Sequence, residues 1–262
     1  MSYKIIRTLI LLVLITGCSG NKNSAPDSEQ MVMATLWYQH SAEMRAIYYQ
    51  TFNLAELRVN QIQEKYIGEK PLAVVVDIDE TMLDNSPLEG KNILEGDRYS
   101  KERWVNWTSN ASAEPLPGSK AFADFLEETG VELFYISNRS VEDLEATIKN
   151  LKLHDFPNAD ADHIFLKTDT SSKKLRRDNL SSTHNIALLI GDNLGDFNEI
   201  FEDRSDRLGK GLVDQHKEDF GSRFIVLPNP MYGSWTSAIY GSTSNLSPRE
   251  IAKKRKSYVT QY

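Results

Sequence analysis

A short stretch early in the chain constrains its fold more than any other part. Five apolar residues at 72–76 are followed at once by Asp77 and Asp79. An uninterrupted apolar run of this length is typical of a parallel strand that is buried on both faces. Open α/β sheets bind their ligands at the carboxyl ends of such strands. Because two carboxylates are costly to bury there without a cation, the pair indicates a metal site; taken alone, it could also be a solvated acidic turn.

Downstream of this stretch, helical and extended patterns alternate. Strands separated by helices form a parallel sheet with right-handed crossovers. The sequence therefore predicts an α/β fold, a Rossmann-like parallel sheet with helices on both faces, with a core at residues 71–240. The further strands are expected at 131–136, 163–166, 185–190 and 223–227, and the helices at 120–129, 141–151, 171–180 and 194–201.

Helical segments are also predicted around this core. Residues 30–70 carry apolar residues at helical spacing without a proline, which indicates one or two helices, broken near residues 51–53. Their apolar stripe could pack on this chain's own core or on a second copy, as a homodimer. Residues 85–115 hold two tryptophans but no long apolar run, and we expect a small, mainly helical cap over the site. A C-terminal helix is expected within 241–262.

The N-terminal 29 residues have the features of a targeting segment. Lys4 and Arg7 precede a short apolar run, and Gly17-Cys18 ends a segment that resembles a bacterial lipobox. We therefore expect residues 1–18 to be a lipoprotein signal peptide, with Cys18 acylated as a membrane anchor, and residues 19–29 to be a flexible tether. Ser19 after the cysteine favours the outer membrane of a Gram-negative cell envelope. The net charge of −7 argues against nucleic acid as a partner.

Residues that can bind phosphate or a metal follow several predicted strands. Ser137 and Asn138 follow the second strand, Asp192 and Asp196 follow the fourth, and Lys173 lies near the start of the helix between the third and fourth. Because parallel strands end at the same edge of a sheet, these groups should converge. The Ser137 hydroxyl and the Asn138 N–H could then bond phosphoryl oxygens, and Lys173 could offset the negative charge.

The expected cluster suits phosphoryl transfer through a covalent intermediate. Asp77 is already ionised and can attack phosphorus without a base. Asp79, further out on the same side, suits a general acid that becomes a base in the second step. Mg²⁺ takes oxygen ligands, which we expect from Asp77, Asp192 and the carbonyl of Asp79, with Asp196 binding a metal-bound water.

Several motifs together resemble a known family. They are the D-x-D-E-T strand end at 77–81, Ser-Asn-Arg at 137–139, the later lysine and the G-D-N-L-G-D run at 191–196. This set is similar to the four-aspartate phosphatases of the haloacid-dehalogenase superfamily. With the lipobox and the tail L-P-N-P-M-Y-G-S-W at 227–235, it resembles the class C acid phosphatases of the bacterial lipoprotein type.

The resemblance implies Mg²⁺-dependent hydrolysis of phosphomonoesters at acidic pH, often of 5′-nucleotides. It implies that Asp77 is the nucleophile, that Asp79 is the acid/base, and that an aromatic pair, at Trp104 and Tyr232, holds a nucleobase. The motif lysine is Lys173 by its distance from the G-D-N-L-G-D run, with Lys167 as the competitor. Two other functions stay open: a phosphotransferase using the same site, and a non-catalytic lipoprotein that binds a ligand at the cell surface.

Overall fold

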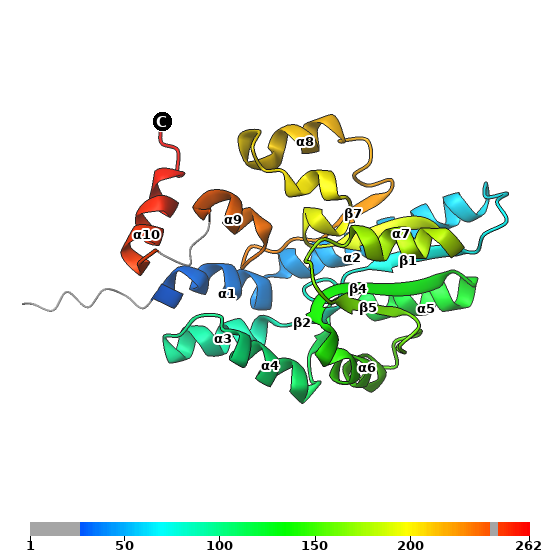
Figure 1. Ribbon diagram of the computed structural model, residues 1–262, viewed down its shortest axis with the longest axis horizontal. Coiled ribbons are helices and arrows are strands. Elements are labelled where there is room, and N and C mark those ends of the chain that lie inside the picture. The colour runs from blue at the N-terminus through cyan, green and yellow to red at the C-terminus, as the bar shows by residue number, and fades with distance from the viewer. Residues whose placement is uncertain (1–26, 242–245) are drawn as a thin grey trace, which may run out of the picture.

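A computed structural model describes residues 27–241 and 246–262 of the chain (Figure 1). The predicted signal peptide, Cys18 and most of the predicted tether lie outside these residues. The last residues of that tether belong to a short 3₁₀ helix, η1, at Asp27–Met31. No helix in the two described ranges is long and apolar enough to cross a membrane.

The centre of the molecule is a five-stranded parallel sheet, as predicted, with the order β5-β4-β1-β6-β7. The central position of β1 explains its uninterrupted apolar sequence, because it has a strand on each side and a helical layer on each face. The strands are β1 Leu72–Val76, β4 Glu132–Ser140, β5 Ile164–Lys167, β6 Asn185–Gly191 and β7 Phe224–Val226.

Helices surround this sheet and extend beyond one end of it (Figure 1). The α-helices are α1 Val32–His40, α2 Ala42–Gln63, α3 Ser86–Glu95, α4 Lys101–Asn110, α5 Ser119–Thr129, α6 Leu144–Leu153, α7 Lys174–Thr183, α8 Lys210–Gln215, α9 Ser234–Tyr240 and α10 Pro248–Ser257. The 3₁₀ helices after η1 are η2 Val141–Asp143, η3 Leu194–Asp196, η4 Glu199–Glu202 and η5 Arg207–Gly209.

Alternate side chains of β1 enter two separate cores. Val74 and Val76 pack in the larger core, together with residues of α2, α5 and α6. Ala73 and Val75 pack in the smaller core on the opposite face, with residues of α7 and of the segment that follows β6. This alternation follows from the two-residue period of a strand. Both faces of the sheet are covered by packed side chains, so a ligand can reach the sheet at the ends of its strands.

The break between the N-terminal helices lies at Ser41, so the predicted break near residues 51–53 is wrong. Ser41 is extended, and its side chain accepts a hydrogen bond from the Met44 N–H, which caps the start of α2. Residues 51–53 stay helical because Phe52 is fully buried and its ring lies 5.4 Å from that of Phe122 in α5. The apolar stripe of α2 thus packs on the chain's own core, while Met33 of α1 stays exposed.

Helices α3 and α4 occupy the residues predicted to form a cap. They are framed by a two-stranded antiparallel pair, β2 Leu83–Asp84 with β3 Glu114–Pro115. Because β2 begins a few residues after β1 ends, this pair fixes the cap beside the carboxyl end of the central strand. The cap is therefore carried by a chain segment that begins a few residues after Asp77 and Asp79.

The segment after β6 differs from its prediction. A single helix at 194–201 was expected, but the chain forms two short 3₁₀ helices, η3 and η4. The Asn193 side chain caps the first, and the Asn198 side chain accepts from the Ile200 N–H to begin the second. Each asparagine offers the backbone an alternative to a continuous helix.

Candidate active site

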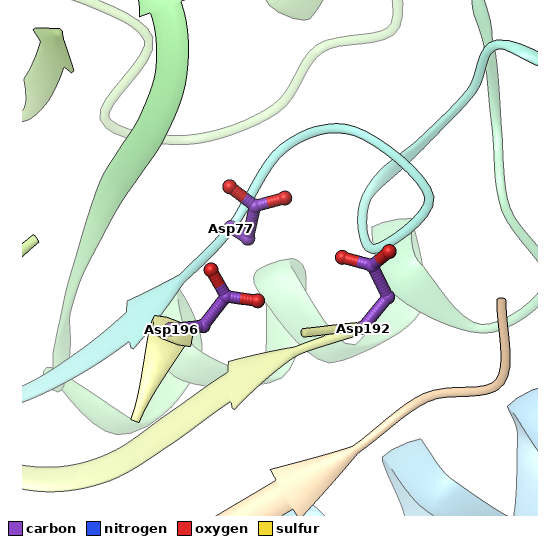
Figure 2. Close-up of side chains that lie close together, drawn as sticks. All are labelled: Asp77, Asp192 and Asp196. Atoms are coloured by element: carbon purple, nitrogen blue, oxygen red, sulfur yellow. The ribbon is translucent and has the colours of Figure 1, made fainter. Parts of the chain in front are cut away.

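Three aspartates meet at the carboxyl end of the sheet. Asp77 follows β1, Asp192 follows β6, and Asp196 lies in η3; Figure 2 shows their side chains close together. Each offers an oxygen that lies within 4.8 Å of the oxygens of the other two. Residues 77 and 192 meet because β1 and β6 are neighbours, with Val76 opposite Ile190. The sheet therefore gathers a set of hard oxygen donors of the kind that divalent cations prefer.

The described residues do not balance the negative charges of this cluster. Burial, which Lys173 only partly offsets, raises the pKa of Asp77 to about 7, and the charges of Asp196 and Asp79 add to the effect. Burial also raises the pKa of Asp192 well above its ordinary value, with Asp196 and Asp77 as further causes. A cation would stabilise the ionised form of these carboxylates. The donor set and the excess negative charge both fit a divalent metal.

Lys173 is the cation that the structure places in this cluster. Its Nζ lies 2.5 Å from Asp77 Oδ1 and 2.7 Å from Asp196 Oδ1, and its side chain is 3% exposed. Burial acts to lower the pKa of Lys173, but the charges of Asp196 and Asp77 outweigh it and the pKa is raised. Lys167, the competing residue, lies in β5 opposite Ser140. Lys173 is thus the lysine that contacts the aspartates.

Asp196 is held against the end of β6 by a close backbone approach. A Cβ at Gly191 would lie 2.3 Å from Asp196 Oδ2, so only glycine fits there. The Asn193 N–H donates to Asp196 Oδ2 at 2.9 Å, and Arg177 donates to the Asp196 carbonyl at 3.1 Å. Arg177 was not singled out from the sequence, although its place in the basic helix after Lys173 was a usable signal.

Asp79 contacts a different set of residues. Its Oδ1 accepts from Arg139 Nη2 at 2.8 Å, from Arg139 Nε at 3.0 Å and from Asn85 Nδ2 at 2.8 Å. The Arg139 side chain is 1% exposed. From the sequence, Arg139 was only part of the Ser-Asn-Arg motif, without a role of its own. Its signal was its position two residues after Ser137, since residues two apart on a strand point to the same side.

Ser137 and Asn138 lie where phosphate ligands were expected, within β4 rather than after it. Ser137 is buried, accepts from the Arg139 N–H at 3.1 Å and donates to Asp79 Oδ2 at 3.3 Å. Asn138 is exposed, and its Oδ1 accepts from Arg176 at 2.7 Å. Arg176 also donates to the Ser137 carbonyl at 2.6 Å and therefore fixes both residues.

The loop after Asp79 has a strained backbone that α1 and α2 support. Glu80 is fully buried with a φ of +57°, a conformation that costs a non-glycine residue about 1–2 kcal/mol. The Tyr48 hydroxyl donates to the Glu80 carbonyl at 2.6 Å, and Tyr38 contacts the Tyr48 hydroxyl. The Glu80 carboxyl accepts from the Asn85 N–H at 2.8 Å. The N-terminal helices thus hold the turn that carries Asp77 and Asp79.

A cleft of about 1040 Å³ opens over these groups. Its lining includes Asp77, Asp79 and Lys173 from the core, Trp104 from the cap and Tyr232 from the loop after β7. The Tyr232 hydroxyl is buried and has no hydrogen-bond partner among the described residues. The two aromatic residues expected to hold a nucleobase therefore line the same cleft as the aspartates.

The chain was compared with known proteins. Residues 21–235 match the family described as HAD superfamily, subfamily IIIB (acid phosphatase). The chain belongs to this family. Phosphatases of the HAD superfamily generally use a divalent metal, which agrees with the cluster of Asp77, Asp192 and Asp196.

Solved structures of the class C acid phosphatase from Bacillus anthracis are similar to this chain. One has a TM-score of 0.86 at 40% identity and covers 90% of this chain and 99% of that one. Another, with tungstate bound, has a TM-score of 0.84 at 40% identity and covers 90% and 98%. A stem 31 kDa glycoprotein of Glycine max is 25% identical over 184 residues. The match spans 66% of this chain and 66% of the glycoprotein, which is just under two thirds of the length of that protein. The family and the structural match indicate phosphomonoesterase activity.

Proposed function

We propose that this HAD subfamily IIIB protein is a Mg²⁺-dependent acid phosphatase that hydrolyses phosphomonoesters, including 5′-nucleotides, through an aspartyl-phosphate. The observation that carries the proposal is the placement of Asp77. It lies among carboxylates that fit a metal, with Lys173 Nζ 2.5 Å away and Asp79 two residues further on. A reactive carboxylate, a fixed positive charge and a second carboxyl group are the parts that a two-step displacement requires.

In the first step, an oxygen of Asp77 attacks phosphorus, and the bond to the leaving oxygen breaks as Asp79 donates a proton to that oxygen. In the second step, water attacks phosphorus and gives a proton to Asp79, and the bond to Asp77 breaks to release phosphate. Lys173 stabilises the negative charge of Asp77 before the attack and again when the bond to phosphorus breaks. Asp77, Asp192, Asp196 and the carbonyl of Asp79 would hold Mg²⁺ when it is bound, and it would neutralise charge on the phosphoryl group.

Nucleotides are proposed as substrates because of the aromatic residues in the cleft. Trp104 and Tyr232 offer apolar surfaces on which a base can stack, and stacking tolerates different bases. The B. anthracis structure solved with tungstate shows that a relative binds a tetrahedral oxyanion, the shape of phosphate.

The function is tested by assaying AMP and p-nitrophenyl phosphate with Mg²⁺ or EDTA. We expect Mg²⁺-dependent release of phosphate that Asp77→Asn abolishes. With p-nitrophenyl phosphate, whose leaving group departs without a proton, we also expect phosphate-labelled Asp77 to accumulate in Asp79→Asn, detectable by mass spectrometry of the quenched protein. Asp162→Asn, which alters an exposed aspartate outside the cleft lining, is the matched control and should keep full activity. Retained turnover in Asp77→Asn would refute the mechanism.

We also propose that the protein is anchored to the cell envelope through Cys18, in the outer membrane if the cell is Gram-negative. The support is the lipobox-like segment that ends at Cys18, the single cysteine of the chain. Labelled palmitate should enter the wild-type protein and not Cys18→Ser, and the variant should leave the membrane fraction. Equal labelling of both would contradict the anchor.

A further inference from the structure

We propose that cap helix α4 positions the acid/base carboxyl group of Asp79, acting through Asn85 and Arg139, so that Oδ2 is the oxygen that exchanges the proton. The inference rests on the acid/base role proposed for Asp79. It assigns positioning roles to Trp107, Asn85 and Arg139.

The two oxygens of Asp79 have different surroundings. Oδ1 accepts three N–H groups at 2.8–3.0 Å, two from Arg139 and one from Asn85. These donors occupy its lone pairs, so it has no site for a proton. Oδ2 has only longer contacts, 3.2 Å to Arg139 Nε and 3.3 Å to Ser137 Oγ. Oδ2 is therefore the oxygen that exchanges a proton with the leaving group and later with water.

The Asn85 amide is oriented by the cap. Trp107 of α4 donates from Nε1 to Asn85 Oδ1 at 2.7 Å. Because an indole N–H can only donate, the amide oxygen must face Trp107 and the amide nitrogen must face Asp79. The indole thus determines which end of the Asn85 side chain meets the carboxyl group, through two consecutive hydrogen bonds.

Arg139 is oriented from the same helix. Its guanidinium carbon lies 6.0 Å from the centre of the Trp104 ring, within the range of a cation–π contact. Its Nη1 donates to Thr147 Oγ1 at 3.2 Å, which leaves Nε and Nη2 to form the fork on Asp79. Each group that holds Oδ1 is therefore in contact with a tryptophan of α4.

This arrangement predicts a dependence on the leaving group. A misplaced Oδ2 slows departure of a poor leaving group, which needs a proton as its bond to phosphorus breaks. A good leaving group departs as an anion and is affected less. Phenyl phosphate and p-nitrophenyl phosphate make a suitable pair, since they are similar in shape and phenoxide is the poorer leaving group.

The experiment measures kcat/KM of both esters with saturating Mg²⁺ in wild type, Trp107→Phe and Arg139→Lys. The ratio of the two kcat/KM values does not depend on how much enzyme is folded. We expect the phenyl to p-nitrophenyl ratio to fall about 10-fold in Arg139→Lys and about 3-fold in Trp107→Phe. Trp37→Phe makes the same substitution in α1, outside this network and the cleft lining, and should leave the ratio unchanged.

A second measurement separates positioning from packing. In an Asp79→Asn background, Arg139→Lys should leave the ratio unchanged, because the group that it positions is already gone. The inference would be overturned if Arg139→Lys lowered kcat/KM equally for both esters, or if the ratio were lower in the double variant than in Asp79→Asn alone. The proposed function is refuted by a different result, namely that Asp77→Asn keeps turnover. If Asp77→Asn is inactive but the phenyl to p-nitrophenyl ratio is unchanged in Arg139→Lys and Trp107→Phe, only the positioning role is refuted.

Discussion

Lys173 Nζ lies 2.5 Å from Asp77 Oδ1 although the two residues are 96 positions apart, and both side chains are buried. Removing one member of a buried ion pair leaves the other charge uncompensated, which costs about 3–5 kcal/mol. Lys173→Gln should therefore lower the melting temperature of the metal-free protein by several degrees and reduce kcat by about 100-fold or more.

Lys167→Gln is the control for that substitution, because Lys167 is the alternative lysine and lies in β5. We expect it to keep kcat within about 2-fold of wild type and to change stability by no more than about 0.5 kcal/mol. Thermal melting and steady-state kinetics of both variants check this. The assignment would be reversed if the Lys167 variant were inactive and the Lys173 variant active.

Gly191→Ala should damage the metal site. Its Cβ would lie 2.3 Å from Asp196 Oδ2, so the carboxylate must shift. We expect weaker Mg²⁺ binding by calorimetry and a loss of activity of about 10-fold or more, since small displacements in a catalytic site are costly. Gly195→Ala is the matched control: the nearest atom to its Cβ is 3.8 Å away. Similar behaviour of the two variants would contradict the steric argument.

The stability of the metal-free protein should depend on pH. Burial raises the pKa of Asp77 to about 7, above its ordinary value of 3.8. Between these values the folded protein holds a proton that the unfolded chain releases, so stability decreases as pH rises through this window. The pKa of Asp192 is also raised by burial, so it contributes to the same pH dependence.

The check is a series of melting curves in EDTA from about pH 4 to about pH 7.5, repeated with Mg²⁺. The melting temperature should fall as pH rises, and Mg²⁺ should restore more stability at the high end, where protons compete less for the carboxylates. Asp77→Asn should flatten the slope. A melting temperature in EDTA that rises over this range in wild type, with the same slope in Asp77→Asn, would disprove the assignment.

Tyr48→Phe should loosen the loop that follows Asp79. It removes the closer of two donors to the buried Glu80 carbonyl and leaves only the Tyr38 hydroxyl at 3.5 Å; an unsatisfied buried acceptor costs about 1–3 kcal/mol. We expect lower thermal stability and a modest decrease in kcat, because this contact supports the positive φ of Glu80. Tyr66→Phe removes a hydroxyl that donates to the Lys70 carbonyl at the surface, and should have little effect on either. An unchanged melting temperature in Tyr48→Phe would show that the loop does not need this bond.

Much of the fold is predictable from the sequence, because the apolar run of β1 identifies it as a buried strand. Its five apolar residues require burial on both faces, and this places Asp77 at a strand end and at the centre of a parallel sheet. Parallel topology then brings the ends of β4 and β6 to the same edge, so Ser137 and Asp192 could be named in advance. These inferences need only local periodicity and one topological rule.

Other features depend on contacts between distant residues and on local capping. The choice of Lys173 over Lys167 follows from its contacts with Asp77 and Asp196, and the continuity of α2 through residues 51–53 follows from the burial of Phe52 against Phe122 of α5. The fork of Arg139 on Asp79 joins residues 60 positions apart. Residue types and spacing identified the candidate groups for the chemistry. Only the tertiary structure decided which donor faces which carboxylate oxygen, because that depends on side-chain packing between elements that no local pattern records.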